Sequence, residues 1–270
     1  MISDQLNHED IILFRKIEDE KRGFRTITYQ IPSDFWIKHD IEEFKYYQFY
    51  RYRNSEFFFS RHVIIVESKT EAEIIKSLLE MFKIDLNGAG ISIIDLDGVR
   101  NIKYPYYLLK YLNIPHLIIV DKDFFIPYYS DELKLSRDTY GFPKYKYQFS
   151  DESFIKDLIP NERDRNKLLR LLKENHSKAM DLLGKYNIIC FNYSTEIDLI
   201  SSDTARNEYF RILDIPESKR TKQELLIERR KQIKKIEHIL EVLKNTPRRS
   251  LPNPYKRIIR VSKEKFKFKY

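Results

Sequence analysis

The stretch RHVIIVESKTEAEIIKSLLEMF, residues 61–82, decides the fold of this chain. Residues 62–66 form a continuous apolar run of strand length, which predicts a strand covered on both faces of a sheet. The run ends at Glu67, and Glu71 lies in the first turn of a segment whose apolar residues recur at helical spacing. The stretch therefore predicts a buried strand that leads directly into an amphipathic helix, with a carboxylate at each end of the connecting turn.

The same kind of apolar run recurs three times. GISIIDLDG (90–98), PHLIIVDKD (115–123) and YNIICF (186–191) predict three more buried strands. YPYYLLKYLN (104–113) predicts a short helix between the second and the third strand. Strands that alternate with helices through short links predict an α/β fold, here a Rossmann-like parallel sheet flanked by helices.

The segments outside this alternating unit have other patterns. Residues 1–60 form a lead-in that contains a strand-like segment, and the aromatic residues at 41–60 suit either a contact surface or core packing. Residues 126–152 predict a loop, because Tyr, Pro and Lys occur there without a period. Residues 221–245 predict one long amphipathic helix, and the alternation in residues 256–270 predicts an edge strand or an ordered tail.

Composition limits the class of protein. The 270-residue chain is long enough for one large core or two modest domains. Its net charge of +8 is uneven, because residues 218–270 hold eighteen Lys or Arg against five Glu. That basic end fits a nucleic-acid partner, and a solvated helix face explains it equally well. Cys190 is the only cysteine, which excludes an internal disulfide and favours a cytoplasmic location, and no apolar stretch approaches the roughly 20 residues of a membrane span.

Acidic residues follow each of the four predicted strands. In chain order they are Glu67, Asp95 with Asp97, Asp121 with Asp123, and Glu196. Because the C-terminal ends of parallel strands share one edge of the sheet, we expect these side chains to gather there. Clustered carboxylates repel one another, and a divalent cation with oxygen ligands removes that cost. Each acid alone is more simply a helix cap, so it is the combination that predicts a metal site.

These residues also carry a resemblance to a known family. VIIVESKTEAEII (63–75) and the segment that ends in PHLIIVDKD resemble the TOPRIM domain of the OLD-family (overcoming lysogenization defect) nucleases. The matching motif residues are Glu67, Thr70 and Glu71, then Gly98 and Asn101, then Asp121 and Asp123. YSTEIDL (193–199) resembles the later acidic motif of the family. The resemblance predicts a TOPRIM domain at 61–215, after the lead-in at 1–60 and before a basic helical region at 216–270.

The resemblance implies a divalent-metal-dependent endonuclease that hydrolyses phosphodiester bonds. It implies one or two Mg²⁺ or Mn²⁺ ions, held by Glu67, Glu71, Asp121, Asp123, Ser194 and Glu196. Glu67, Asp121 and Asp123 would also be catalytic, with Glu67 as a candidate general base. The family has a catalytic lysine further along the chain, for which Lys256 is our first candidate and Lys263 our second. Ser68 departs from the family, which has glycine in this turn.

Partners also follow from the resemblance, which favours DNA over RNA as the substrate. Full-length OLD proteins carry an ABC-type ATPase, whereas this sequence has no G-x-x-x-x-G-K-[ST] motif. We therefore expect a separate ATPase, a docking role for the lead-in and a role in bacterial anti-phage defence, and homo-oligomerisation stays open. Two other functions compete: TOPRIM chemistry of the topoisomerase or primase kind, and a non-catalytic module that binds nucleic acid or an ATPase.

Overall fold

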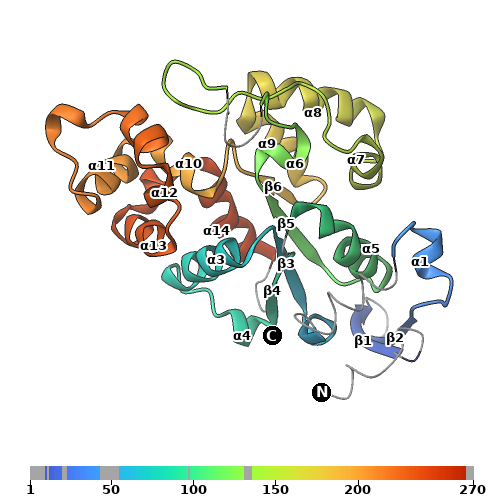
Figure 1. Ribbon diagram of the computed structural model, residues 1–270. Coiled ribbons are helices and arrows are strands. Elements are labelled where there is room, and N and C mark those ends of the chain that lie inside the picture. The colour runs from blue at the N-terminus through green and yellow to red at the C-terminus, as the bar shows by residue number, and fades with distance from the viewer. Residues whose placement is uncertain are drawn as a thin grey trace.

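The centre of the molecule is a four-stranded parallel sheet with strand order β4-β3-β5-β6 (Figure 1). The computed structural model describes residue 10 and residues 12–19, 23–42, 55–96, 98–130 and 136–265. The strands of the sheet are β3 (His62–Val66), β4 (Ile91–Asp95), β5 (His116–Val120) and β6 (Ile188–Cys190). All four lie within the apolar runs named above, so the parallel α/β fold predicted from the sequence is confirmed.

Side chains alternate between two cores on the two faces of the sheet. On β3, Val63 and Ile65 belong to one buried cluster, whereas Ile64 and Val66 belong to the other. On β5, Ile118 and Ile119 divide in the same way. Successive side chains of a strand point to opposite faces, so a strand with helices on both sides must be apolar at every position.

Helices cover both faces. The first core contains side chains of α5 (Lys103–Tyr111), α7 (Glu152–Leu158), α8 (Glu162–Glu174) and α9 (His176–Gly184). The second contains side chains of α3 (Lys69–Met81), α10 (Thr195–Ser201), α11 (Asp203–Ile212), α13 (Ile236–Asn245) and α14 (Asn253–Lys265). Shorter helices are α1 (Phe35–Lys38), η3 (Ser55–Phe59), α4 (Leu86–Ala89), η4 (Val99–Ile102), α6 (Lys122–Phe125), η6 (Glu217–Lys219), the π-helix η7 (Glu224–Glu228), α12 (Arg230–Ile233) and η8 (Arg248–Ser250).

The N-terminal lead-in contains a separate antiparallel hairpin of β1 (Ile12–Asp19) and β2 (Gly23–Gln30). This hairpin confirms the strand-like segment predicted there. Phe35 and Trp36 of α1 are buried in the first core, which joins the lead-in to the body of the molecule. Much of the aromatic segment at 41–60, residues 43–54, lies outside the described residues.

Two predictions about the C-terminal region are wrong. The helix expected at 221–245 is divided into η7, α12 and α13, and Lys235 has an extended backbone between the last two. Leucines of η7 and of α13 nevertheless belong to the same core. The second error concerns residues 256–265, which belong to α14 and not to an edge strand. Tyr255, Ile258 and Ile259 are each fully buried, at the spacing of a helix.

The described residues 126–130 and 136–151 contain no helix or strand, as expected for the predicted loop. It is held by two isolated bridges, Tyr128 to Tyr145 and Arg137 to Pro143. Among the helices of the described residues, none has the length and apolar character required to cross a membrane.

Candidate metal and phosphate site

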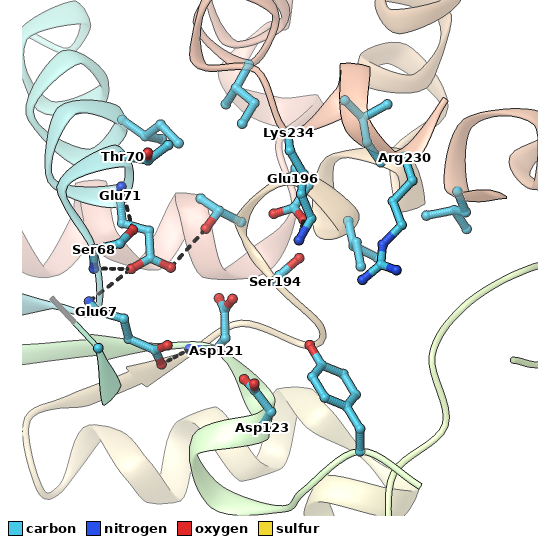
Figure 2. Close-up of a pocket in the computed structure, with 18 of the residues that line it drawn as sticks. Glu67, Ser68, Thr70, Glu71, Asp121, Asp123, Ser194, Glu196, Arg230 and Lys234 are labelled. Atoms are coloured by element: carbon cyan, nitrogen blue, oxygen red, sulfur yellow. Dashed lines mark hydrogen bonds and ion pairs between the residues drawn. The ribbon is translucent and has the colours of Figure 1, made fainter. Parts of the chain in front are cut away.

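A pocket of about 700 Å³ lies at the C-terminal edge of the parallel sheet, and we call it the acidic pocket (Figure 2). Its polar and charged lining residues are Glu67, Ser68, Thr70, Glu71, Asp121, Asp123, Tyr128, Arg137, Ser194, Thr195, Glu196, Arg230 and Lys234. They come from the turn between β3 and α3, from the end of β5 through α6 and the following loop, from the start of α10, and from α12 with its C-cap residue Lys234. Four parts of the chain that are far apart in the sequence therefore build one concave site.

Three carboxylates form its centre. Ligand oxygens of Glu67, Asp121 and Asp123 all lie within 4.8 Å of one another. Glu67 directly follows β3, and Asp121 directly follows the neighbouring strand β5. The backbone N–H of Asp121 donates to Glu67 Oε1 at 2.9 Å, which fixes the two strand ends together. The parallel topology thus places these acids side by side, as predicted.

This cluster is electrostatically unfavourable by itself. Burial raises the pKa of Glu67 well above its usual range, and the charges of Glu71 and Asp123 raise it further. Burial also raises the pKa of Asp121, and the surrounding carboxylates, with Glu71 first, add to the rise. The pocket therefore favours the protonated acids unless a positive charge is bound among them.

Glu71 has a structural role in the turn between β3 and α3. Its Oε2 accepts hydrogen bonds from the backbone N–H groups of Glu67 at 2.9 Å and Ser68 at 3.0 Å. Ser68 Oγ in turn accepts from the N–H of Glu71, so the pair forms a capping box. Ser68 has φ −144° and ψ 161°, which is ordinary extended backbone. Serine therefore fits this turn without strain, although the family pattern has glycine here.

The remaining oxygen of Glu71 faces α10. Thr195 Oγ1 donates to Glu71 Oε1 at 3.4 Å, across 124 positions of the sequence. Burial raises the pKa of Glu71 to about 7, although its two backbone hydrogen bonds act in the opposite direction. Glu196 and Ser194 line the same pocket, both buried. The structure thus brings the three other predicted metal ligands, Glu71, Ser194 and Glu196, to the same pocket, outside the central group of three carboxylates.

Gly98 lines the pocket, and Asn101 lies in the turn that follows β4. Gly98 has φ +125°, a conformation that favours glycine, and its N–H donates to the carbonyl of Glu67 at 3.0 Å. The Asn101 side-chain amide donates to the carbonyl of Leu96 at 2.9 Å and closes the same turn. Asp95 ends β4 but does not line the pocket, and Asp97 lies outside the described residues.

A cationic wall, formed by Arg137, Arg230 and Lys234, lines the pocket together with the carboxylates. The Lys234 ammonium lies 3.7 Å from Glu196 Oε1. Burial lowers the pKa of Arg137, and the positive charge of Arg230 lowers it further, so the two guanidinium groups interact. In Figure 2 the side chains of Arg230 and Lys234 extend toward the carboxylates.

The sequence analysis did not identify these three cations. Arg230 and Lys234 follow Leu226 at i+4 and i+8, so basic residues continue an apolar helix stripe, and this pattern could have revealed them. Arg137 lies in the loop after α6 and has no comparable signal. Lys256, our first candidate for the catalytic lysine, lines a different pocket between α9 and α14, and Lys263 does not line the acidic pocket either.

The residues at the centre fit a divalent cation. Asp121 Oδ1 and Ser194 Oγ are buried and have no hydrogen-bond partner within the described part of the chain. Buried polar atoms in folded proteins are almost always satisfied, so these two oxygens point to an additional group. The donors are carboxylate and hydroxyl oxygens, which select Mg²⁺, Mn²⁺ or Ca²⁺ over softer metals.

A parallel sheet with carboxylates at its C-terminal edge defines the class of this fold as α/β and is consistent with a TOPRIM fold. Within that class, residues 58–123 match the family model described as overcoming lysogenization defect protein-like, TOPRIM domain. The match extends from η3 to Asp123, so it includes three of the four strands and the central carboxylates. Residues 58–123 are therefore similar to an OLD-like TOPRIM domain.

Two solved structures are also similar to this chain. One is the C-terminal region of the Xanthomonas campestris pv. campestris OLD protein, with 17% identity over 77% of this chain and 97% of that chain and a TM-score of 0.46. The other is the C-terminal region of the Burkholderia pseudomallei OLD protein, with 18% identity over 77% of this chain and all of that chain and a TM-score of 0.43. No curated protein matches this chain.

Proposed function

We propose that this protein is a divalent-metal-dependent endonuclease that hydrolyses phosphodiester bonds in nucleic acid. The observation that carries the proposal is the group of Glu67, Asp121 and Asp123, with ligand oxygens within 4.8 Å of one another and a buried Asp121 oxygen that has no hydrogen-bond partner within the described residues. A cationic wall in the same pocket supports a phosphate as the group that approaches these acids.

Glu67, Asp121 and Asp123 would hold a first Mg²⁺ or Mn²⁺ ion, and Glu71, Ser194 and Glu196 would contribute to a second. Such an ion supplies Lewis-acid polarisation of a phosphoryl oxygen. Glu67 is also our candidate general base on the attacking water, a role that the family resemblance implies. Its Oε1 accepts the N–H of Asp121, so Oε2 is the oxygen that would accept a proton from this water.

The cationic wall would stabilise negative charge that develops on the phosphate during cleavage. Lys234 is now our candidate for the lysine that the family resemblance implies, in place of Lys256, because it lines the acidic pocket and lies near Glu196. Arg230 and Arg137 add two guanidinium groups, whose planar donors match phosphate oxygens.

Incubation of the purified protein with supercoiled plasmid and with total RNA, in Mg²⁺ or in Mn²⁺, tests this function. We expect nicked or linear plasmid, or shortened RNA, and we expect the double variant Asp121→Ala/Asp123→Ala to bind nucleic acid without cutting it. Sealed relaxed circles would instead identify a topoisomerase. Undiminished cutting by the double variant would refute the proposed site, and calorimetry that shows no Mg²⁺ or Mn²⁺ binding would favour a non-catalytic module.

The biological setting of this activity is proposed from the family resemblance. We propose a role in bacterial anti-phage defence, in the cytoplasm, together with a separate ABC-type ATPase that docks on the lead-in at residues 1–60. Cleavage assays with and without the candidate ATPase test this arrangement, and DNA is the first substrate to examine. In this proposal residues 61–215 form the catalytic unit, and the basic region at 216–270 contributes Arg230 and Lys234 to its pocket.

A further inference from the structure

A second charged pocket, of about 590 Å³, lies between α9, η8 and the start of α14, and we call it the basic pocket. Five of its nine lining residues are cationic, namely Arg248, Arg249, Lys256, Arg257 and Arg260. None of the nine lines the acidic pocket. The basic pocket is therefore a separate site.

Four of these cations have no carboxylate partner in the part of the chain that the structure describes. Among the described residues that line the pocket, Asp181 is the only acidic one, and its Oδ1 already accepts from Arg257 Nη1 at 2.7 Å. No ion pair within the described residues involves Arg248, Arg249, Lys256 or Arg260. Like charges that converge on one concave surface repel, and a bound anion removes that repulsion.

The cations are held on a rigid base. Tyr255, Ile258 and Ile259 bury one face of α14 completely, which leaves Lys256, Arg257 and Arg260 to line the pocket from the helix. The Tyr255 hydroxyl also donates to the carbonyl of Thr195 at 2.7 Å. The orientation of α14 is therefore fixed by the same helix, α10, that carries Glu196 of the acidic pocket.

Arg257 is fixed more closely than the others. Its side chain is 14% exposed, and it packs against Gly184, where an added Cβ would lie 2.4 Å from the guanidinium. Its Nε is buried and has no hydrogen-bond partner within the described residues. The pocket also contains Asn253, the first residue of the 13-residue helix α14, where the helix dipole favours an anion.

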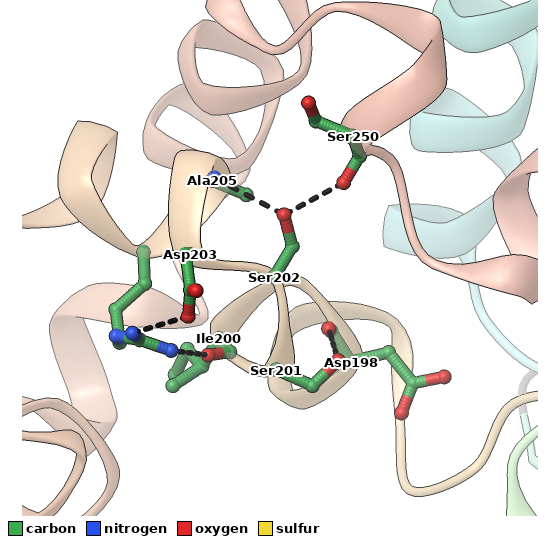
Figure 3. A network of polar contacts seen from close by, with 8 residues as sticks. Asp198, Ile200, Ser201, Ser202, Asp203, Ala205 and Ser250 are labelled. Atoms are coloured by element: carbon green, nitrogen blue, oxygen red, sulfur yellow. Dashed lines mark hydrogen bonds and ion pairs between the residues drawn. The ribbon is translucent and has the colours of Figure 1, made fainter.

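The 3₁₀ turn η8, which supplies Arg248 and Arg249, is anchored by a serine at the α10–α11 junction (Figure 3). Ser202 Oγ donates to the carbonyl of Ser250 at 2.6 Å and accepts from the N–H of Ala205. The two arginines thus project from a turn whose backbone is held in place.

We propose that the basic pocket is a second phosphate-binding site, which holds the backbone of a nucleic-acid strand away from the acidic pocket. Arginine-rich sites match phosphate because the guanidinium donates two parallel hydrogen bonds. A long polyanion is the favoured ligand because the surplus of Lys and Arg extends through residues 218–270, beyond what one small anion requires. This proposal rests on the proposed function for its ligand, a nucleic acid, but it concerns binding and not cleavage. Binding at the basic pocket and cleavage at the acidic pocket can therefore be tested, and can fail, independently.

Fluorescence anisotropy in EDTA, with labelled single-stranded and duplex oligonucleotides at 50 to 200 mM salt, measures this binding without cutting. The variant is Lys256→Gln/Arg260→Gln, which removes two cations at i and i+4 of α14. The matched control is Arg163→Gln/Lys167→Gln, which removes two exposed cations at the same spacing on α8. Circular dichroism confirms that both variants remain folded.

We expect the α14 variant to bind about tenfold more weakly at 100 mM salt and to reduce the slope of log K against log salt by about 1 to 2, whereas the control changes neither. Equal binding by wild type and the α14 variant, or an equal loss in the control, would overturn the proposal. Full competition by micromolar mononucleotide would overturn the assignment to a strand and identify a nucleotide site. Cleavage-deficient Asp121→Ala/Asp123→Ala protein should keep the wild-type slope.

Discussion

Replacing Asp121 by asparagine removes one negative charge from the centre of the acidic pocket and keeps the shape of the side chain. In the metal-free protein, ionised Asp121 is unfavourable, because it is buried among other carboxylates and its Oδ1 has no hydrogen-bond partner within the described residues. We therefore expect Asp121→Asn to stabilise the metal-free protein, although most substitutions at buried positions destabilise.

The magnitude follows from the neighbouring acid. Glu71 has a pKa of about 7 against an ordinary 4.5, so its ionisation above pH 7 costs the fold about 3 kcal/mol, at about 1.4 kcal/mol per pH unit. The pKa of Asp121 is raised for the same reasons. We take about 1 to 2 kcal/mol as the net gain after the cost of burying the amide, which raises Tm by about 2 to 6 °C in a chain of this size.

A divalent cation should reverse this order. Wild type gains about 2.7 kcal/mol at a metal concentration of 100 times Kd, and the variant loses most of that gain with its ligand. The assay is thermal unfolding at pH 8, in EDTA and in Mg²⁺ or Mn²⁺. The control is Asp214→Asn, because Asp214 is exposed and asparagine tolerates its φ of 49°. A lower Tm for Asp121→Asn in EDTA, together with equal metal responses in the two proteins, would refute the reasoning.

Three further predictions concern the same pocket. The free energy of unfolding of the metal-free protein should fall as pH rises from about 4.5 to about 7, because acids with raised pKa values bind more protons in the folded state. Urea unfolding in EDTA at pH 5, 6 and 7 measures this loss, and bound metal should reduce the pH dependence. Lys234→Ala should lower kcat by about 10- to 1000-fold with little change in binding, whereas Lys256→Ala should mainly raise KM, and equal effects of both would contradict the separation of the two pockets. Gly141→Ala should lower the free energy of unfolding by about 1 to 3 kcal/mol, because Gly141 has φ +92° and a Cβ there would lie 3.3 Å from Leu226. It should also lower activity, because the carbonyl of Gly141 accepts a hydrogen bond from Arg137 Nη1. Unchanged activity would show that this turn does not position Arg137.

Local patterns in the sequence determined the sheet and the place of its acids. Residues 63–66 and 117–120 are apolar at every position because each strand faces two cores, and this requirement can be read without knowing which helices form those cores. Parallel strands then bring Glu67 and Asp121 to one edge, so the carboxylate cluster follows from chain order and topology alone. The resemblance to OLD-family TOPRIM domains rests on the same short motifs.

Only the tertiary structure decided which cations lie near those acids. Arg137 and Lys234 line the acidic pocket, while Lys256 lies in the basic pocket. The spacing of Lys234 from Leu226 is a weak local signal, and the sequence around Arg137 has none. The break at Lys235 and the helical state of residues 256–265 depend in the same way on how the C-terminal segments pack against the sheet. The periodicity of a sequence predicts which face of a helix or strand is buried. What that face packs against depends on contacts between residues a hundred or more positions apart in the sequence, such as Thr195 and Glu71.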